Sequence, residues 1–268
     1  MRLRELAVVL TGASGGIGLE LTGQLCAGGA RVLGISRHLG GLATLMNRYP
    51  QQLRWHSADL RSRNGRQEVV TAAWAMGGVN VLINAAGVNR FALLEQVDED
   101  TLDDLLDLNI KAPLQLTRLL LPLLREHPNA LVVNVGSIYG SIGYPGYATY
   151  SASKFALRGF SEALRRELAD TSVDVLYVAP RATRTSMNSS AATALNQALK
   201  VGMDDPVDVA RAVLDAVQNQ RSELYLGWPE KLFVRLNGML PGLVDRALRK
   251  QLPLIRRYSD VNTKEHSK

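Results

Sequence analysis

Short apolar segments alternate with longer amphipathic segments along most of the chain. Several apolar segments are unbroken runs of Val, Leu and Ile, which is typical of β-strands covered on both faces. They lie at residues 6–10, 31–36, 53–58, 79–84, 130–136, 173–178 and 224–226. The segments between them follow the 3.6-residue period of helices, at residues 16–27, 40–48, 64–76, 101–108, 112–126, 151–169 and 206–218.

This alternation predicts an α/β fold in three layers, with a doubly wound, parallel, seven-stranded sheet and helices on both faces. We expect one catalytic domain over residues 1–227. Residues 181–200 are rich in Ala, Thr, Ser and Asn and have a weak pattern. They predict either a mobile flap at the carboxyl edge of the sheet, where such folds bind ligands, or a plain solvent loop.

The segment 228–268 is expected to be a basic, amphipathic extension and not an independent domain. An apolar stretch at 230–240 is followed by a break at Pro241 and Gly242 and by a second helical pattern with a basic face. Three roles stay open for this extension: docking over the substrate cleft, docking on another subunit, and peripheral contact with a membrane surface. Residues 259–268 have the composition of a disordered end.

Composition excludes several classes of protein. The single cysteine, Cys26, rules out an internal disulfide and is typical of a cytoplasmic protein; it lies in an apolar helical stretch and is interpreted as part of the core. The first residues lead directly into a strand, so we expect no signal peptide. No apolar run approaches the roughly 20 residues that span a bilayer. Nothing in the sequence indicates a metal site.

The net charge of +6 is concentrated at one end of the chain. Residues 228–268 contain nine basic and four acidic side chains, whereas residues 1–227 contain 22 basic and 21 acidic ones. The body of the protein is therefore nearly neutral, which argues against a nucleic-acid-binding surface spread over the domain.

A glycine-rich turn, TGASGGIG at residues 11–18, follows the first strand and opens the first helix. In this context Gly12 permits a tight turn, Gly16 lets the backbone approach a pyrophosphate, and Gly18 allows close packing of helix and strand. The N-terminus of the helix then offers free N–H groups to an anion. The turn predicts a dinucleotide site.

The residue after the second strand indicates which dinucleotide is bound. Arg37 stands there, with no acidic residue near it, and an arginine suits the 2′-phosphate of NADP(H) rather than the free ribose hydroxyl of NAD(H). Its neighbour His38 is interpreted as a bystander. We therefore expect NADP(H) to be preferred over NAD(H).

The candidate catalytic residues lie in a YSASK segment at 150–154, with a serine thirteen residues before its tyrosine. Tyr150 and Lys154 are four residues apart and so share a helix face. We expect the ammonium to lower the pKa of the phenol from about 10 toward neutrality, where it can exchange a proton with a substrate oxygen. The hydroxyl of Ser137 can hydrogen-bond to the same oxygen.

Together these motifs resemble those of the short-chain dehydrogenase/reductase family, in its compact single-domain branch, over about residues 6–226. The resemblance implies a Rossmann fold. It implies that the catalytic residues are Asn109, Ser137, Tyr150 and Lys154, and that Lys154 also binds the nicotinamide ribose. It implies cofactor contacts from Gly12, Ser14, Gly16, Ile17, Gly18, Arg37, Asp59, Leu60, Asn84, Ala85, Gly87, Tyr150, Lys154, Thr183 and Thr185.

One position departs from the family pattern. Arg181 stands where the family has a glycine, and an arginine would be strained there if the backbone needed a positive φ. Arg181 and Arg184 are also candidates for binding an anionic group of the substrate, although surface arginines are the simpler interpretation.

The predicted function is that of an NADP(H)-dependent oxidoreductase, which transfers a hydride between nicotinamide and a carbonyl or secondary alcohol, with Tyr150 as general acid and base. The apolar extension favours a lipophilic substrate. The alternatives are a 3-oxoacyl-carrier-type reductase and a cofactor-binding sensor or scaffold without turnover. The resemblance also implies a homodimer or homotetramer.

Overall fold

The computed structural model describes residues 1–266, with side chains described through Ser259. Its centre is a seven-stranded parallel sheet in the order β3-β2-β1-β4-β5-β6-β7. The strands are β1 Ala7–Thr11, β2 Arg31–Ser36, β3 Leu53–Ser57, β4 Val81–Asn84, β5 Ala130–Val135, β6 Val173–Ala179 and β7 Glu223–Tyr225. β1, β4 and β5 are buried along their whole length, which explains their continuous apolar sequences.

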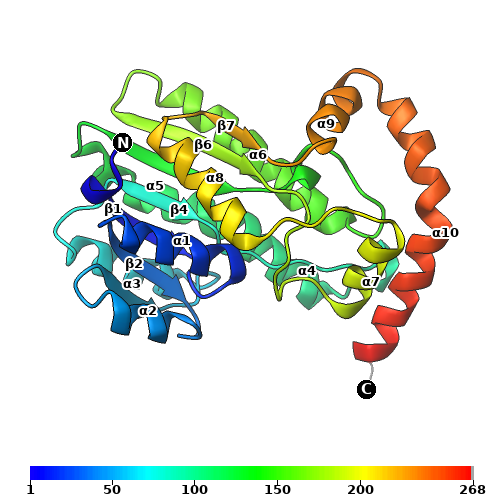
Figure 1. The fold of residues 1–268 in the computed structure, drawn as a ribbon, viewed down its shortest axis with the longest axis horizontal. Helices are drawn as coiled ribbons and strands as arrows, with labels where there is room; N and C mark the ends of the chain where they lie inside the picture. The colour runs from blue at the N-terminus through cyan, green and yellow to red at the C-terminus, as the bar shows by residue number, and fades with distance from the viewer. Residues whose placement is uncertain (267–268) are drawn as a thin grey trace.

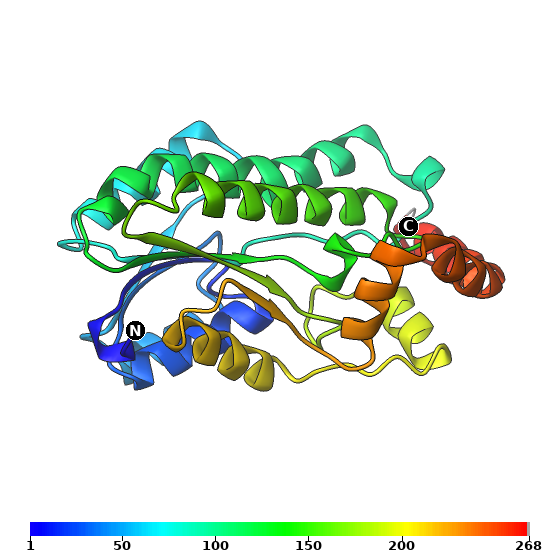
Figure 2. The same ribbon diagram turned by 90° about the horizontal axis from the view of Figure 1, so that it is seen from above.

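Helices cover both faces of the sheet and complete a three-layer Rossmann-type fold (Figures 1 and 2). One face packs against α1 Gly16–Ala27, α2 Leu42–Arg48 and α8 Pro206–Gln218. The other packs against α3 Arg63–Trp74, α5 Ala112–Arg125 and α6 Ala148–Glu167, and α4 Glu99–Leu106 precedes α5. Cys26 is buried in the first of these layers, as expected of a core residue, and burial raises the pKa of its thiol to about 11.

The strand order reverses between β1 and β4, where the chain winds outward in both directions. In doubly wound sheets, ligands bind outside the carboxyl ends of the strands at this switch point. The glycine-rich turn after β1 and the turn after β4 meet there, because Thr11 pairs with Asn84. The fold therefore brings two of the predicted cofactor motifs together.

The predicted fold class and all seven strands are confirmed, but two expectations for irregular segments need correction. Residues 181–200 are not a plain solvent loop, since they contain α7 Ser190–Ala198, which buries Ala191, Ala192 and Leu195; the mobile flap stays a prediction. The expected disorder at 259–268 is also wrong as far as the structure describes it, since α10 Pro241–His266 continues through this region and Ser259 is fully buried.

The extension consists of α9 Glu230–Met239 and α10, separated by the predicted break at Pro241. Figure 1 shows both helices at the end of the molecule where α7 lies. The Ile255 side chain of α10 is fully buried in a cluster with Tyr147 and Tyr150, and Tyr144 Oη lies 2.6 Å from Gln251 Oε1 as its hydrogen-bond donor. The extension is thus docked on the aromatic cluster that contains Tyr150. Within the described residues, no helix has the length and apolar character needed to cross a membrane.

Candidate active site

The glycine-rich turn is shaped by close backbone contacts. Gly12 has φ +70°, and a Cβ atom there would lie 2.8 Å from the backbone nitrogen of Ala86. A Cβ atom on Gly18 would lie 2.1 Å from the Gly12 carbonyl oxygen. Larger residues at either position would therefore push the turn away from β4 or from α1. Ser14 and Ile17 lie in the same turn and are half-buried.

The turn is joined to the two other loops of the predicted cofactor site. Thr11 Oγ1 accepts hydrogen bonds from the backbone N–H groups of Ala85 and Ala86, both at 3.1 Å. On the other side, a Cβ atom on Gly16 would lie 2.5 Å from the Cγ2 atom of Thr185. The N-terminus of α1 has no side-chain cap, so its N–H groups face this junction without a capping partner.

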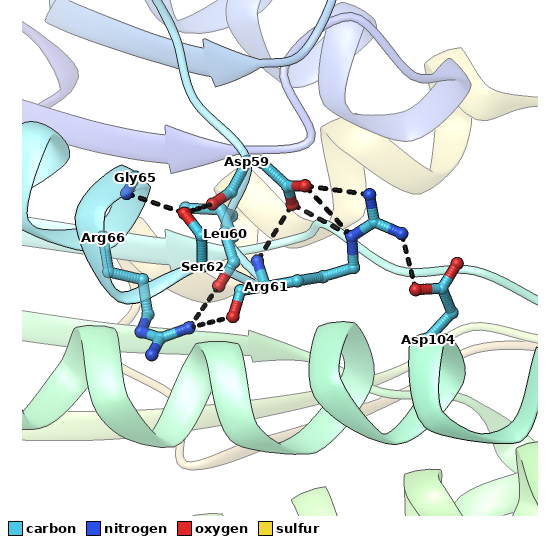
Figure 3. A network of polar contacts seen from close by, with 7 residues as sticks. All are labelled: Asp59, Leu60, Arg61, Ser62, Gly65, Arg66 and Asp104. Atoms are coloured by element: carbon cyan, nitrogen blue, oxygen red, sulfur yellow. Dashed lines mark hydrogen bonds and ion pairs between the residues drawn. The ribbon is translucent and has the colours of Figure 1, made fainter. Parts of the chain in front are cut away.

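Beyond β2 and β3 the candidate adenosine side of the site is polar. Arg37 is exposed and makes no ion pair within the described residues. Asp59 is bound by Arg61, whose Nη2 lies 2.8 Å from Asp59 Oδ2 and whose Nη1 lies 2.6 Å from Asp104 Oδ1 (Figure 3). The hydrogen bonds from Arg61 hold the pKa of Asp59 below its ordinary value. The Leu60 carbonyl accepts from Arg66 Nη1 at 2.7 Å, so this loop is fixed by its own contacts.

Asn84 lies at the predicted site but its side chain points into the core. Its amide Nδ2 donates to Asn134 Oδ1 at 2.8 Å and to Thr117 Oγ1 at 3.2 Å, and Asn134 in turn donates to Ser161. The side chain of Asn84 is 4% exposed. If Asn84 contributes to cofactor binding, it does so indirectly, because its side-chain hydrogen bonds fix the turn after β4. In that turn Ala85 contacts the glycine-rich turn and Gly87 contacts Asn109.

The four predicted catalytic residues come from three parts of the fold, the turn after α4, the end of β5 and α6, and converge. Asn109 lies in a π-helical turn, Asp107–Lys111, between α4 and α5, which agrees with the gap between the helices predicted at 101–108 and 112–126. Its Oδ1 atom accepts from the Val88 N–H at 2.9 Å, and its Nδ2 atom donates to Ser153 Oγ at 3.1 Å. Gly87 leaves room for this contact, because a Cβ atom there would lie 3.1 Å from Asn109 Oδ1 and 3.7 Å from Lys154 Nζ.

Tyr150 and Lys154 share a face of α6, with the Lys154 Nζ atom 5.6 Å from the centre of the Tyr150 ring. Both side chains are more than nine-tenths buried. Lys154 Nζ donates to the Val135 carbonyl at 3.1 Å. Ser137 follows β5 and forms a hydrogen bond with Tyr150.

The expected fall of the Tyr150 pKa toward neutrality is wrong for this structure. Burial raises the pKa of Tyr150 to about 12, and the hydrogen bond with Ser137 opposes this only in part. Burial also lowers the pKa of the Lys154 ammonium to about 8. Desolvation of both groups outweighs their attraction. The phenol is consequently protonated at neutral pH, which is the form that donates a proton to a carbonyl oxygen.

Two residues that the sequence reasoning missed hold these groups in position. Tyr177 on β6 donates from its Oη to the Ser137 carbonyl at 3.2 Å, and its ring fills the space left by Gly136 and Gly140. Ser153 is fully buried and donates to the Tyr150 carbonyl at 2.7 Å. Ser153 is one of several hydroxyl residues on the buried face of α6, with Thr149, Ser151 and Ser161, so its sequence position did not distinguish it, and nothing local marked Tyr177.

The departure at Arg181 has a structural explanation. Its φ is not positive, since Lys200 and Gln220 are the only non-glycine residues with positive φ in the described chain, so the expected strain is absent. Its Nη2 lies 2.7 Å from Asp204 Oδ1 and its Nη1 lies 3.3 Å from Glu230 Oε2. The arginine thus joins the end of β6 to α9.

The idea that Arg181 and Arg184 bind an anionic group of the substrate is not supported. Arg181 is neutralised by two carboxylates. Arg184 pairs with Asp205 at 3.7 Å and donates to the Met203 carbonyl at 2.7 Å.

The last part of the predicted site lies in the segment between β6 and α7. Thr183 is buried, its Oγ1 donates to the Arg181 carbonyl at 3.0 Å, and its own carbonyl accepts from Asn188 Nδ2 at 2.8 Å. Thr185 lies against the glycine-rich turn. Thr185 therefore joins the segment after β6 to the uncapped N-terminus of α1. This arrangement fits a dinucleotide, with its phosphates at the turn and its reactive end beside Tyr150 and Lys154.

Known proteins resemble the chain over most of its length. A family model described as short chain dehydrogenase matches residues 6–196. A 3-oxoacyl-(acyl-carrier-protein) reductase of Thermotoga maritima is 30% identical over 231 residues, which cover 83% of this chain and 94% of the relative.

Solved structures agree. A short-chain dehydrogenase from Streptomyces avermitilis is 30% identical with a TM-score of 0.79, covering 94% of this chain and 98% of its own. A 3-ketoacyl-(acyl-carrier-protein) reductase from Brucella melitensis, complexed with NADH, has the same fold with a TM-score of 0.77 at 23% identity, covering 85% of this chain and 99% of its own.

Proposed function

Because the chain belongs to the short-chain dehydrogenase/reductase family of oxidoreductases, we propose that it reduces a carbonyl group with NADPH. The observation that carries the proposal is the convergence of Asn109, Ser137, Tyr150 and Lys154 at the carboxyl edge of the sheet, beside the glycine-rich turn. The nicotinamide dinucleotide, when bound, supplies the hydride that the carbonyl carbon accepts.

The chain's own residues supply the proton and the positioning. Tyr150 donates its phenolic proton to the carbonyl oxygen, so that carbon gains a hydride, oxygen gains a proton, and the product is an alcohol. The Ser137 hydroxyl donates a hydrogen bond to the same oxygen and stabilises the charge that develops on it. Lys154 provides a cation beside the tyrosinate that remains and is proposed to hold the nicotinamide ribose.

The direct test is NADPH oxidation across a panel of carbonyl compounds, from small ketones to long-chain acyl and terpenoid compounds. Turnover of any member supports the reductase, and the ranking of substrates identifies the class. The apolar cluster around Tyr150 favours a lipophilic chain. The 30% identity to a 3-oxoacyl-(acyl-carrier-protein) reductase makes 3-oxoacyl thioesters the first candidates. Tight NADPH binding without turnover would favour the sensor.

Arg37 is proposed to select NADPH by binding its 2′-phosphate. Replacing it with alanine in Arg37→Ala is expected to lower kcat/KM for NADPH about tenfold or more, because one charge-assisted hydrogen bond is lost, and to leave NADH unchanged. The measurement is the ratio of kcat/KM for the two cofactors in both proteins. Arg48→Ala, which removes an exposed arginine from α2, is the matched control. A wild-type preference for NADH would refute the assignment.

The exposed side of the extension is proposed to contact an anionic membrane surface. Six large apolar side chains there are at least 44% exposed, namely Trp228, Leu232, Phe233, Met239, Leu240 and Leu243. The same two helices carry five exposed basic side chains, namely Lys231, Arg235, Arg246, Arg249 and Lys250. Apolar insertion combined with a positive rim is typical of attachment to anionic lipid.

Co-sedimentation with vesicles tests this contact. We expect binding to phosphatidylcholine vesicles that contain phosphatidylserine, weaker binding to phosphatidylcholine alone, and a loss in the double variant Trp228→Ser and Met239→Ser. Absence of sedimentation at low salt would contradict the proposal. Concentration-dependent self-association through the same residues would assign this face to the proposed homodimer or homotetramer instead.

A further inference from the structure

A cavity of about 210 Å³ opens between the loop that follows β4 and the segment that precedes α7. Asn89, Arg90 and Phe91 line one side, and Ser186, Asn188 and Ser189 line the other. This volume is far above the roughly 10–15 Å³ that one water needs. The cavity can therefore hold a chemical group of several atoms.

Two polar atoms in the cavity wall are buried without a partner. Arg90 Nε and Asn89 Oδ1 have no hydrogen bond within the described residues. A buried polar group without a partner is costly, so such groups are rare in folded proteins unless ordered water or a ligand satisfies them. The Arg90 Nε–H group is thus available to an acceptor on a bound molecule, whereas Asn89 Oδ1 is itself an acceptor and is available only to an N–H or O–H group.

The electrostatics of the cavity favour an anion. None of its lining residues is acidic, and Arg90 has no ion pair within the part of the chain that the structure describes. Arg90 has a small effect on the pKa of Asp98, which is lowered mainly by the hydrogen bond from the Thr101 N–H. Asp98 therefore does not neutralise Arg90 as an ion-pair partner would. The N-terminus of α7, capped by Ser189, lies in the wall and adds a positive dipole end. Arg181, by contrast, is already neutralised by two carboxylates.

The cavity adjoins the catalytic tyrosine through aromatic contacts. The Phe91 ring lies 5.2 Å from the Tyr147 ring, and Tyr147 lies 6.2 Å from Tyr150, centre to centre. Asn89 also forms a side-chain hydrogen bond with Tyr147. The wall of the cavity is therefore continuous with the aromatic cluster that contains Tyr150.

We propose that this cavity binds an anionic oxygen group of the substrate, a carboxylate or a phosphate, with Arg90 as the specificity-determining cation. The proposal rests on the carbonyl reduction proposed above and narrows its substrates to oxo compounds that carry such a group at a distance from the carbonyl. The Arg90 guanidinium donates to the anion, and Asn89 and the α7 N-terminus complete the polar wall.

Two pairs of substrates test the proposal and separate the two sources of the anion. One pair is a long-chain oxo acid and its methyl ester, and the other is a 3-oxoacyl thioester of phosphopantetheine and of pantetheine. We expect kcat/KM to favour the charged member of one pair about 10- to 100-fold, which corresponds to one hydrogen bond to a charged group. The pair that shows the preference identifies the anion.

The variants assign the preference to Arg90. Arg90→Gln is expected to abolish the kcat/KM preference for the charged substrate while leaving kcat/KM for the neutral substrate unchanged. Arg90→Lys is expected to retain most of the preference. Arg211→Gln, which removes an exposed arginine from α8, is the matched control and should retain all of it. Equal rates for both members of both pairs, or an equal loss on charged and neutral substrates in Arg90→Gln, would overturn the proposal.

Failure of this proposal and failure of the reductase give different results. If carbonyl compounds are reduced but charged substrates are not preferred, the reductase proposal is supported and the anion-site proposal is wrong. If no carbonyl is reduced, thermal shift still tests the site: the oxo acid should raise the Tm of the wild type more than its ester does, and Arg90→Gln should remove the difference. Thermal melting and NADPH binding also verify that each variant is folded.

Discussion

Tyr150→Phe is expected to lower kcat/KM for carbonyl reduction by about 10²–10⁴-fold while leaving NADPH affinity unchanged. The loss follows from removing the only proton donor that we assign to the carbonyl oxygen, since general acid catalysis contributes a factor of this size. Phenylalanine keeps the ring that packs in the cluster with Tyr147 and Ile255, so the wall of the site is retained. Steady-state rates and a cofactor titration measure the two quantities separately.

Tyr225→Phe is the matched control for this experiment. It removes the same hydroxyl from a half-buried ring on β7, at the edge of the sheet; because this ring packs against Tyr177, thermal melting of the variant also verifies that the packing of Tyr177 is retained. We expect wild-type rates from it. If Tyr150→Phe retained more than a tenth of the wild-type rate, another group would have to supply the proton, and the assignment of Tyr150 would be wrong.

Lys154→Met is expected to lower kcat/KM at least 10²-fold and, at pH 7, to raise the free energy of unfolding measured without cofactor. Burial lowers the pKa of the ammonium from 10.5 to about 8, which corresponds to roughly 3 kcal/mol of destabilisation at neutral pH. Methionine has a similar length and no charge to desolvate. The variant loses the hydrogen bond from Lys154 to the Val135 carbonyl, which reduces the stabilisation by about 1 kcal/mol. We therefore expect the free energy of unfolding to rise by about 1–3 kcal/mol in total.

The pH dependence distinguishes this desolvation from improved packing. Between pH 8 and 10.5 the unfolded chain binds a proton on Lys154 that the folded protein has released, so wild-type stability rises with pH through this window. The variant lacks this rise, and its advantage should shrink from pH 7 to pH 10. Below pH 10 the raised pKa of Tyr150 has little effect on this comparison. A constant advantage across this range, or a less stable variant at pH 7, would contradict the explanation.

The sheet could be predicted because its strands carry their burial in their own sequences. β1, β4 and β5 are covered on both faces, so each is an unbroken apolar run that no amphipathic helix imitates. The glycine-rich turn was equally readable, since Gly12 and Gly18 stand where backbone atoms approach too closely for any side chain. Both features are encoded by residues that are neighbours in the sequence, so they can be recognised without knowledge of the fold.

The remaining features depend on residues that are far apart in the chain. Arg181 pairs with Asp204 and Glu230, which are 23 and 49 residues away in the sequence. Because nothing near Arg181 in the sequence indicated these partners, it was interpreted as a strained or substrate-binding residue. The Tyr150 pKa was misjudged because helical spacing gives the distance to Lys154 but not the depth of burial. The polar residues at 259–266 continue a helix whose inner face meets α7, a contact that composition does not reveal.

The docking of α10 on the aromatic cluster beside Tyr150 also affects the folding of the chain during its synthesis. A ribosome synthesises every strand of the sheet before it reaches Gln251 and Ile255, which cover the aromatic cluster. Until then Phe91, Tyr144 and Tyr147 line an apolar surface that the nascent chain exposes to water. Exposed surfaces of this kind drive association between incomplete chains. We therefore expect the newly made chain to associate more readily before α10 docks than afterwards.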